Sequence, residues 1–195
     1  MRYATTVAAA ITLGALASPA AASEPRIADI SGAWSGTGFV QRDAEARPMK
    51  VRCAINGDQD GDDLGFEGEC RAMLVLKRAI GASIVREGPR YSGTYTGSNA
   101  GVAALEGARA EDGSIVLHMT FEREINGDDV ALMTITPSDG RTFTITTVDR
   151  MEDGVDVTTS QITFERDADV SARDDEAPAA GATVGGDAEA AAPPR

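Results

Sequence analysis

The chain of 195 residues has one histidine, His118, and two cysteines, Cys53 and Cys70. A zinc site needs several Cys or His ligands at defined spacing, and a histidine base needs a nucleophile and an orienting partner. Neither arrangement can be assembled from so few residues, and no glycine-rich phosphate loop precedes a helix. We therefore expect no cofactor and no catalytic residue, and we expect that the protein is not an enzyme.

Basic residues are also scarce. Lys and Arg number 18 against 31 Asp and Glu, which gives a formal net charge of −13. An acidic chain repels nucleic-acid phosphates and anionic lipid surfaces. We expect no nucleic-acid partner, no membrane insertion and a monomer that binds a small apolar ligand or a protein partner.

The N-terminal segment has the three parts of a secretory signal peptide. Met1-Arg2-Tyr3 is a positive start, residues 7–16 are apolar, and Ala20-Ala21-Ala22 offers small residues for cleavage. The apolar run is shorter than the ~20 residues that span a bilayer. The segment 1–22 is predicted to be a signal peptide cleaved after Ala22, which places the protein in a bacterial periplasm or outside the cell.

The two cysteines flank an acidic turn whose midpoint lies between Gly61 and Asp62. If the stretch forms a hairpin, Cys53 and Cys70 face each other on adjacent strands, and an oxidising compartment would join them. Loop-entropy models value such a bridge at roughly 3 kcal/mol. We predict one disulfide.

Residues 30–166 have the alternation of β-strands. Apolar residues recur at every second position from Ile115 to Phe121, and Asp-Gly and Asn-Gly pairs separate such runs. The alternation changes face before Ile162, as a β-bulge would cause. Strands are predicted near 31–41, 48–56, 64–74, 75–86, 90–97, 101–109, 114–125, 128–137, 141–150 and 155–166.

A meander of nine or ten strands would leave two open edges, which closure into a barrel removes. The predicted fold class is all-β, an antiparallel up-and-down β-barrel of about 8–10 strands, with a two-sheet sandwich as the alternative. Residues 23–29 form an N-terminal arm and 30–166 the barrel. Residues 167–195, rich in Ala, Pro, Gly and acids, are expected to be a disordered tail.

Short motifs resemble known families. Gly32-Ala33-Trp34 resembles the first-strand Gly-x-Trp of lipocalin-like and other calycin-type barrels, which implies that Trp34 closes one end of the barrel. The chain is also similar to a group of uncharacterised exported alphaproteobacterial proteins, through the runs Trp34-Ser35-Gly36, Val51-Arg52-Cys53, Glu69-Cys70-Arg71 and Tyr91-Ser92-Gly93-Thr94-Tyr95.

Gly-x-Trp followed by a cysteine pair further resembles the periplasmic inhibitors of secreted metalloproteases. That family inserts its mature N-terminal segment into the protease active site. The resemblance implies that residues 23–27 are an inserting arm.

The acidic turn matches the spacing of a calcium loop, N-x-D-x-D-G-x5-E, with ligand positions at Asn56, Asp58, Asp60 and Glu67. Asn at the first position, Asp63 in place of an apolar residue and strand-like flanks all depart from that loop. A solvated hairpin tip is favoured, and calcium remains the alternative.

Three function classes stay open. The first is an exported, non-catalytic barrel that binds a small apolar or amphipathic ligand in its interior. The second is a protease inhibitor that acts through the N-terminal arm. The third is an enzyme whose site lies at the barrel mouth around His118.

Overall fold

A computed structural model describes residues 29–42, 45–73, 75–138 and 140–168. The predicted signal peptide, most of the N-terminal arm and nearly all of the predicted tail lie outside these residues. The described chain forms ten strands: β1 (Gly32–Val40), β2 (Met49–Asp60), β3 (Asp63–Ala72), β4 (Leu76–Glu87), β5 (Arg90–Ser98), β6 (Gly101–Arg109), β7 (Ile115–Ile125), β8 (Asp128–Pro137), β9 (Thr142–Arg150) and β10 (Asp156–Arg166).

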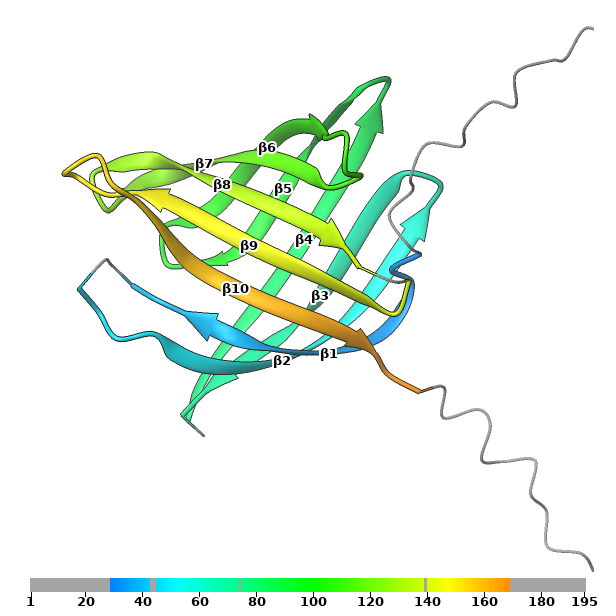
Figure 1. Ribbon diagram of the computed structural model, residues 1–195, viewed down its shortest axis with the longest axis horizontal. Coiled ribbons are helices and arrows are strands. Elements are labelled where there is room, and N and C mark those ends of the chain that lie inside the picture. The colour runs from blue at the N-terminus through cyan, green and yellow to red at the C-terminus, as the bar shows by residue number, and fades with distance from the viewer. Residues whose placement is uncertain (1–28, 43–44, 74, 139, 169–195) are drawn as a thin grey trace, which may run out of the picture.

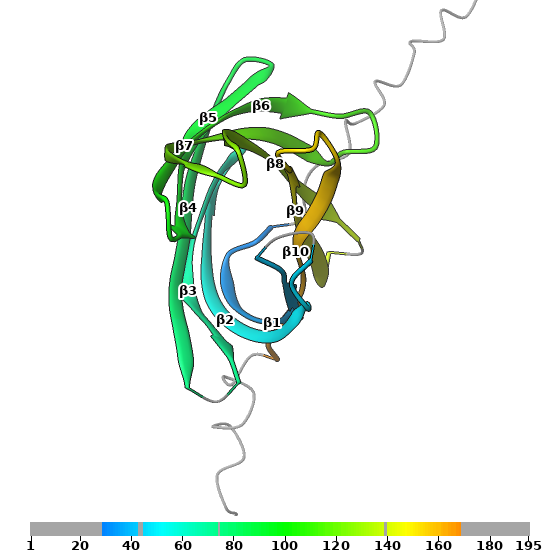
Figure 2. The same cartoon turned by 90° about the vertical axis from the view of Figure 1, so that its left-hand side faces the viewer.

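The strands form one closed antiparallel barrel, as predicted. Each strand pairs with the next in the chain, and β1 pairs with β10 to complete the ring (Figures 1 and 2). Closure leaves neither the first nor the last strand as an edge. The two-sheet sandwich alternative is therefore wrong, and the described residues form a barrel of ten strands.

The sequence placed most strand bounds within one or two residues. The exception is β2, which continues to Asp60, so only Gly61 and Asp62 separate it from β3. The predicted bulge is confirmed, because the β9–β10 register shifts between Thr158 and Ser160.

The barrel interior holds the hydrophobic core, to which every strand contributes at least one large buried side chain. The most deeply buried large side chains, each below 2% exposed, are Trp34, Tyr91, Phe164, Ile84, Leu105, Ile115, Leu117, Met119 and Met133. At a few inward positions the wall bends so sharply that only glycine fits. A Cβ on Gly38 would lie 1.9 Å from the Gln161 carbonyl oxygen.

The two ends of the barrel differ. We call the end where β1 begins and β10 ends the Trp34 end, and the opposite one, with the β3–β4 turn, the Met73 end. At the Trp34 end the indole Nε1 of Trp34 donates a hydrogen bond to the Ile30 carbonyl at 2.7 Å. The Arg166 guanidinium lies 4.4 Å from the centre of the indole, and Phe143 packs edge-on at 4.9 Å. Trp34 thus lies in an aromatic and cationic cap over one end of the core.

Candidate functional site

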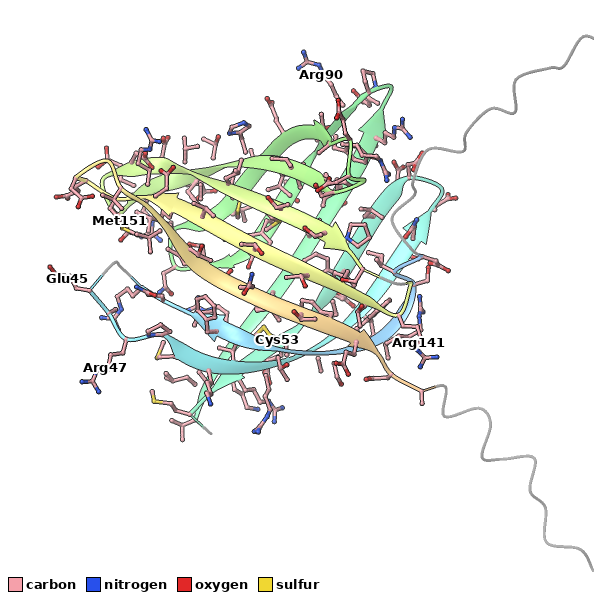
Figure 3. All side chains as sticks on the ribbon, in the orientation of Figure 1. Glu45, Arg47, Cys53, Arg90, Arg141 and Met151 are labelled. Atoms are coloured by element: carbon pink, nitrogen blue, oxygen red, sulfur yellow. A yellow bond between two sulfur atoms is a disulfide. The ribbon has the colours of Figure 1, made fainter. Side chains whose placement is uncertain are left out.

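The β2–β3 hairpin brings the two cysteines together inside the barrel. Cys53 and Cys70 are direct cross-strand partners with Cα atoms 4.0 Å apart, and their sulfur atoms are bonded. Both side chains are at most 8% exposed, and Figure 3 marks Cys53 within the barrel. The bridge fixes the register of the hairpin, and with it the residues on the hairpin's outer face.

A groove runs across that outer face, over strands β2 to β5. Its volume is about 600 Å³, and its lining residues are Asn56, Phe66, Glu67, Gly68, Ala79, Ile80, Gly81, Ala82, Ser83, Thr94 and Thr96. Small-molecule sites fall within a range of roughly 300–1,000 Å³. The groove is therefore large enough to hold a small ligand.

Cross-strand register explains how the groove arises. Asn56 pairs with Glu67, Glu67 with Gly81, and Gly81 with Thr96, so these four residues form one row across four strands. Gly81 lacks a side chain at the centre of this row, which lowers the floor between Glu67 and Thr96. A Cβ there would lie 3.2 Å from both the Phe66 carbonyl oxygen and the Thr96 hydroxyl.

The lining of the groove combines polar and apolar residues. Asn56 offers an amide, Ser83, Thr94 and Thr96 offer hydroxyls, and Glu67 supplies the only carboxylate in the lining. Glu67 is exposed and has no ion pair or hydrogen bond within the described part of the chain. Its carboxylate is therefore free to accept hydrogen bonds from a cationic group.

The calcium candidates lie on one outer face but do not converge. Asn56 opposes Glu67, whereas Asp58 opposes Gly65 and Asp60 opposes Asp63. Successive members are spaced by two strand residues, or about 6.6 Å, along an extended β2. A calcium loop instead curls its ligands around one ion. Among the described residues, no group of three or more His, Cys, Asp or Glu side chains is placed to hold a metal ion.

The end of the acidic hairpin has structural partners instead. Asp62 accepts hydrogen bonds from Arg86 at 2.6 Å and from Arg109 at 3.4 Å, and Asp63 accepts one from the Arg86 backbone N–H at 2.8 Å. Arg109 also donates to the buried Tyr91 hydroxyl at 2.7 Å. These contacts join the β2–β3 turn to β4, β5 and β6.

The structure places His118 away from the barrel mouth. It lies in the middle of β7 on the outer face, exposed, opposite Glu106 of β6 and Leu132 of β8. Its side chain does not line the groove. The inserting arm of the inhibitor hypothesis, residues 23–27, lies outside the described residues.

Asp149 is a buried carboxyl that the sequence analysis did not identify. It points inward from β9 near the Met73 end, is 5% exposed, and accepts a hydrogen bond from Asn126 Nδ2 at 2.6 Å. Burial raises its pKa, and the nearby Asp128 adds to the shift, although the Asn126 hydrogen bond opposes it.

Sequence reasoning also missed most of the groove. Gly81, Ser83, Thr94 and Thr96 are ordinary strand residues in the sequence, and only the register between β3, β4 and β5 makes them neighbours. A usable signal was the run of small residues at alternate positions, Ala79, Gly81 and Ser83, on one strand face.

Comparison with solved structures shows a likeness of fold. The structure of an S-type phycobiliprotein lyase from Guillardia theta matches with a TM-score of 0.49 and 15% sequence identity, covering 71% of this chain and 88% of that chain. No protein-family model matches the chain, and no curated protein sequence matches it. Within the described residues no helix could cross a membrane as an apolar span.

The expectation that the protein is not an enzyme is not supported by this comparison, in which the matched barrel is named as a lyase. The likeness is one of fold alone. The lyase activity is a property of that protein, and none of this chain's residues is assigned a catalytic role from it.

Proposed function

We propose that the protein is an exported small-ligand-binding barrel whose site is the outer groove over β2 to β5. The observation that carries the proposal is the in-register row Asn56–Glu67–Gly81–Thr96, which forms a groove of about 600 Å³ with one carboxylate in its lining. Export is supported by the predicted signal peptide and by the disulfide, which belongs to an oxidising compartment.

The groove is favoured over the barrel interior as the binding site. Large buried side chains enter the interior from all ten strands, and the Trp34 end is capped by Arg166 and Phe143. A ligand in the interior would have to compete for space with these buried side chains, whereas the outer groove is open to solvent.

The chemistry of the groove selects an amphipathic ligand with a cationic head. Glu67 attracts an amine or guanidinium, and the hydroxyls of Thr94 and Thr96 accept further hydrogen bonds from it. Ala79 and Gly81 leave the floor open to an apolar chain. A net charge of −13 adds a long-range attraction for cations.

Three probes of equal chain length test this assignment. Titration calorimetry with octylamine, octanol and octanoate is expected to give the strongest binding for the amine. An exposed ion pair is worth up to about 1 kcal/mol, so the amine should exceed the alcohol by about threefold to fivefold. Octanoate should bind most weakly.

The variant Glu67→Gln should remove the preference for the amine and leave octanol binding unchanged. Asp58→Asn is the matched control, because Asp58 lies on the same outer face two residues along β2 from Asn56, the cross-strand partner of Glu67, but does not line the groove. It should keep the preference. Equal binding of all three probes, or an amine preference that survives Glu67→Gln, would overturn the proposal.

A further inference from the structure

The β3–β4 hairpin carries large apolar side chains at an exposed tip. Met73 is 64% exposed, Val75 80% and Leu76 49%. The pairing of β4 with β5 begins only at Gly81, so the tip extends past β5 and is paired with β3 alone. Figures 1 and 2 both show this hairpin projecting from the barrel wall. Its apolar side chains are therefore accessible to a partner from several sides.

Basic side chains surround this tip on the wall behind it. We call the exposed residues Lys50, Arg52, Arg71, Lys77 and Arg78 the basic collar. They include both lysines of the chain. Glu69 is ion-paired within the collar, 2.5 Å from Arg71 and 3.9 Å from Lys77. Five cations against one carboxylate make this a basic patch on an acidic protein.

Three cations of the basic collar lie next to one another on paired strands. Arg52 and Arg71 are direct cross-strand partners, and Arg71 is in turn opposite Lys77, so three cations lie in one row across β2, β3 and β4. Like charges directly opposite each other destabilise a strand pair. An anionic surface would neutralise this row.

The order of apolar and basic side chains along the hairpin favours a lipid bilayer over an acidic protein as the partner. Met73 and Val75 are at the turn, and Arg71 and Lys77 lie two residues behind them on each strand, about 6.6 Å back. A bilayer presents the same order of layers, with hydrocarbon below and anionic head groups above it. Long basic side chains can reach head groups while apolar neighbours enter the boundary.

We propose that the tip of the β3–β4 hairpin docks on an anionic lipid bilayer. Met73, Val75 and Leu76 enter the boundary of the hydrocarbon, and the basic collar binds the head groups. The sequence predicted repulsion from anionic lipid on the basis of the net charge of the whole chain. The fold instead gathers cations at one projecting hairpin, across the barrel from the acidic β7–β8 and β9–β10 turns (Figures 1 and 2).

Vesicle co-sedimentation of the exported protein tests the proposal. Vesicles of phosphatidylcholine with phosphatidylglycerol should bind the protein, pure phosphatidylcholine should bind it much more weakly, and added salt should weaken the binding. Lys77→Gln should reduce the affinity about fivefold. Val75→Ser should reduce it roughly tenfold through lost apolar burial.

Matched controls lie at the other end of the molecule. Val85→Ser removes an exposed valine from the far part of β4, and Arg90→Gln removes an exposed cation. Figure 3 shows Arg47 on the side of the Met73 end and Arg90 at the opposite end. Both control variants should bind vesicles as the unmodified protein does.

Every tested position is exposed, so the variants should fold normally, which an unchanged melting temperature would verify. No binding to the anionic vesicles would overturn the proposal and leave an acidic protein as the partner to seek. Equal loss in the tip variants and the control variants would also overturn it, because binding would then not depend on the hairpin.

Discussion

Asp149 shows how one residue can make the stability of the barrel depend on pH. Its carboxyl group lies inside the wall, and burial raises its pKa because the charged form loses its hydration. The group therefore binds its proton more tightly in the folded state than in the unfolded state. The contribution of this group to the free energy of unfolding is fully present below the unfolded pKa of about 4. It is lost as the pH rises through the raised pKa of the folded state.

The variant Asp149→Asn is expected to be more stable at neutral pH, by on the order of 1 kcal/mol, because it carries no charge to bury. The hydrogen bond from Asn126 can persist to the new amide oxygen. Urea unfolding of both proteins from pH 4 to 8 would show the difference growing as the pH rises. A difference that stays constant or shrinks over this range would refute the assignment.

The β2–β3 hairpin shows what an element adds to its residues. Its strands hold the disulfide inside the barrel and the groove residues outside, and its turn is held by Arg86 and Arg109. The acidic turn therefore has a structural role at Asp62, while Asp58 and Asp60 remain exposed.

Removal of the Asp62 carboxylate should destabilise the protein. The variant Asp62→Ala leaves the Arg86 and Arg109 side chains, 28% and 14% exposed, without this anionic partner. Hydrogen bonds to charged groups contribute about 1.5–3 kcal/mol, and partial exposure reduces this to a loss of about 1–2 kcal/mol. Denaturant unfolding measures it. Asp60→Ala is the control and should change stability by less than about 0.5 kcal/mol; equal effects of the two variants would show that the arginine contacts contribute little.

Features that depend on residues close together in the sequence could be predicted, and features that depend on contacts between distant residues were mostly missed. Alternation and Asp-Gly or Asn-Gly turns act over a few residues, so strand positions, the bulge and the cysteine pairing could be predicted. Asp58 and Asp60 were expected to lie in the turn, but pairing with β3 keeps this part of the chain extended. The groove and the buried position of Asp149 depend on contacts between different strands. The small residues at alternate positions of β4 were the local signal for the groove, and no local pattern marks Asp149.

At the scale of the whole molecule, the barrel separates its surface into distinct regions. Aromatic and cationic side chains cap the Trp34 end, the groove lies over β2 to β5, and an apolar tip with basic flanks projects at the Met73 end. Because the ring is closed, these regions hold fixed relative positions. Ligand binding and bilayer docking can therefore be tested independently with single variants.

Native mass spectrometry of protein purified from the export compartment tests the central claim, ligand binding in the groove, most directly. We expect a retained small organic molecule with a cationic group, lost from Glu67→Gln and from Thr96→Trp, which fills the groove from an exposed position. Asp58→Asn should retain it. A protein without any bound molecule, a molecule retained by both groove variants, or a calcium ion lost from Asp58→Asn would contradict the account.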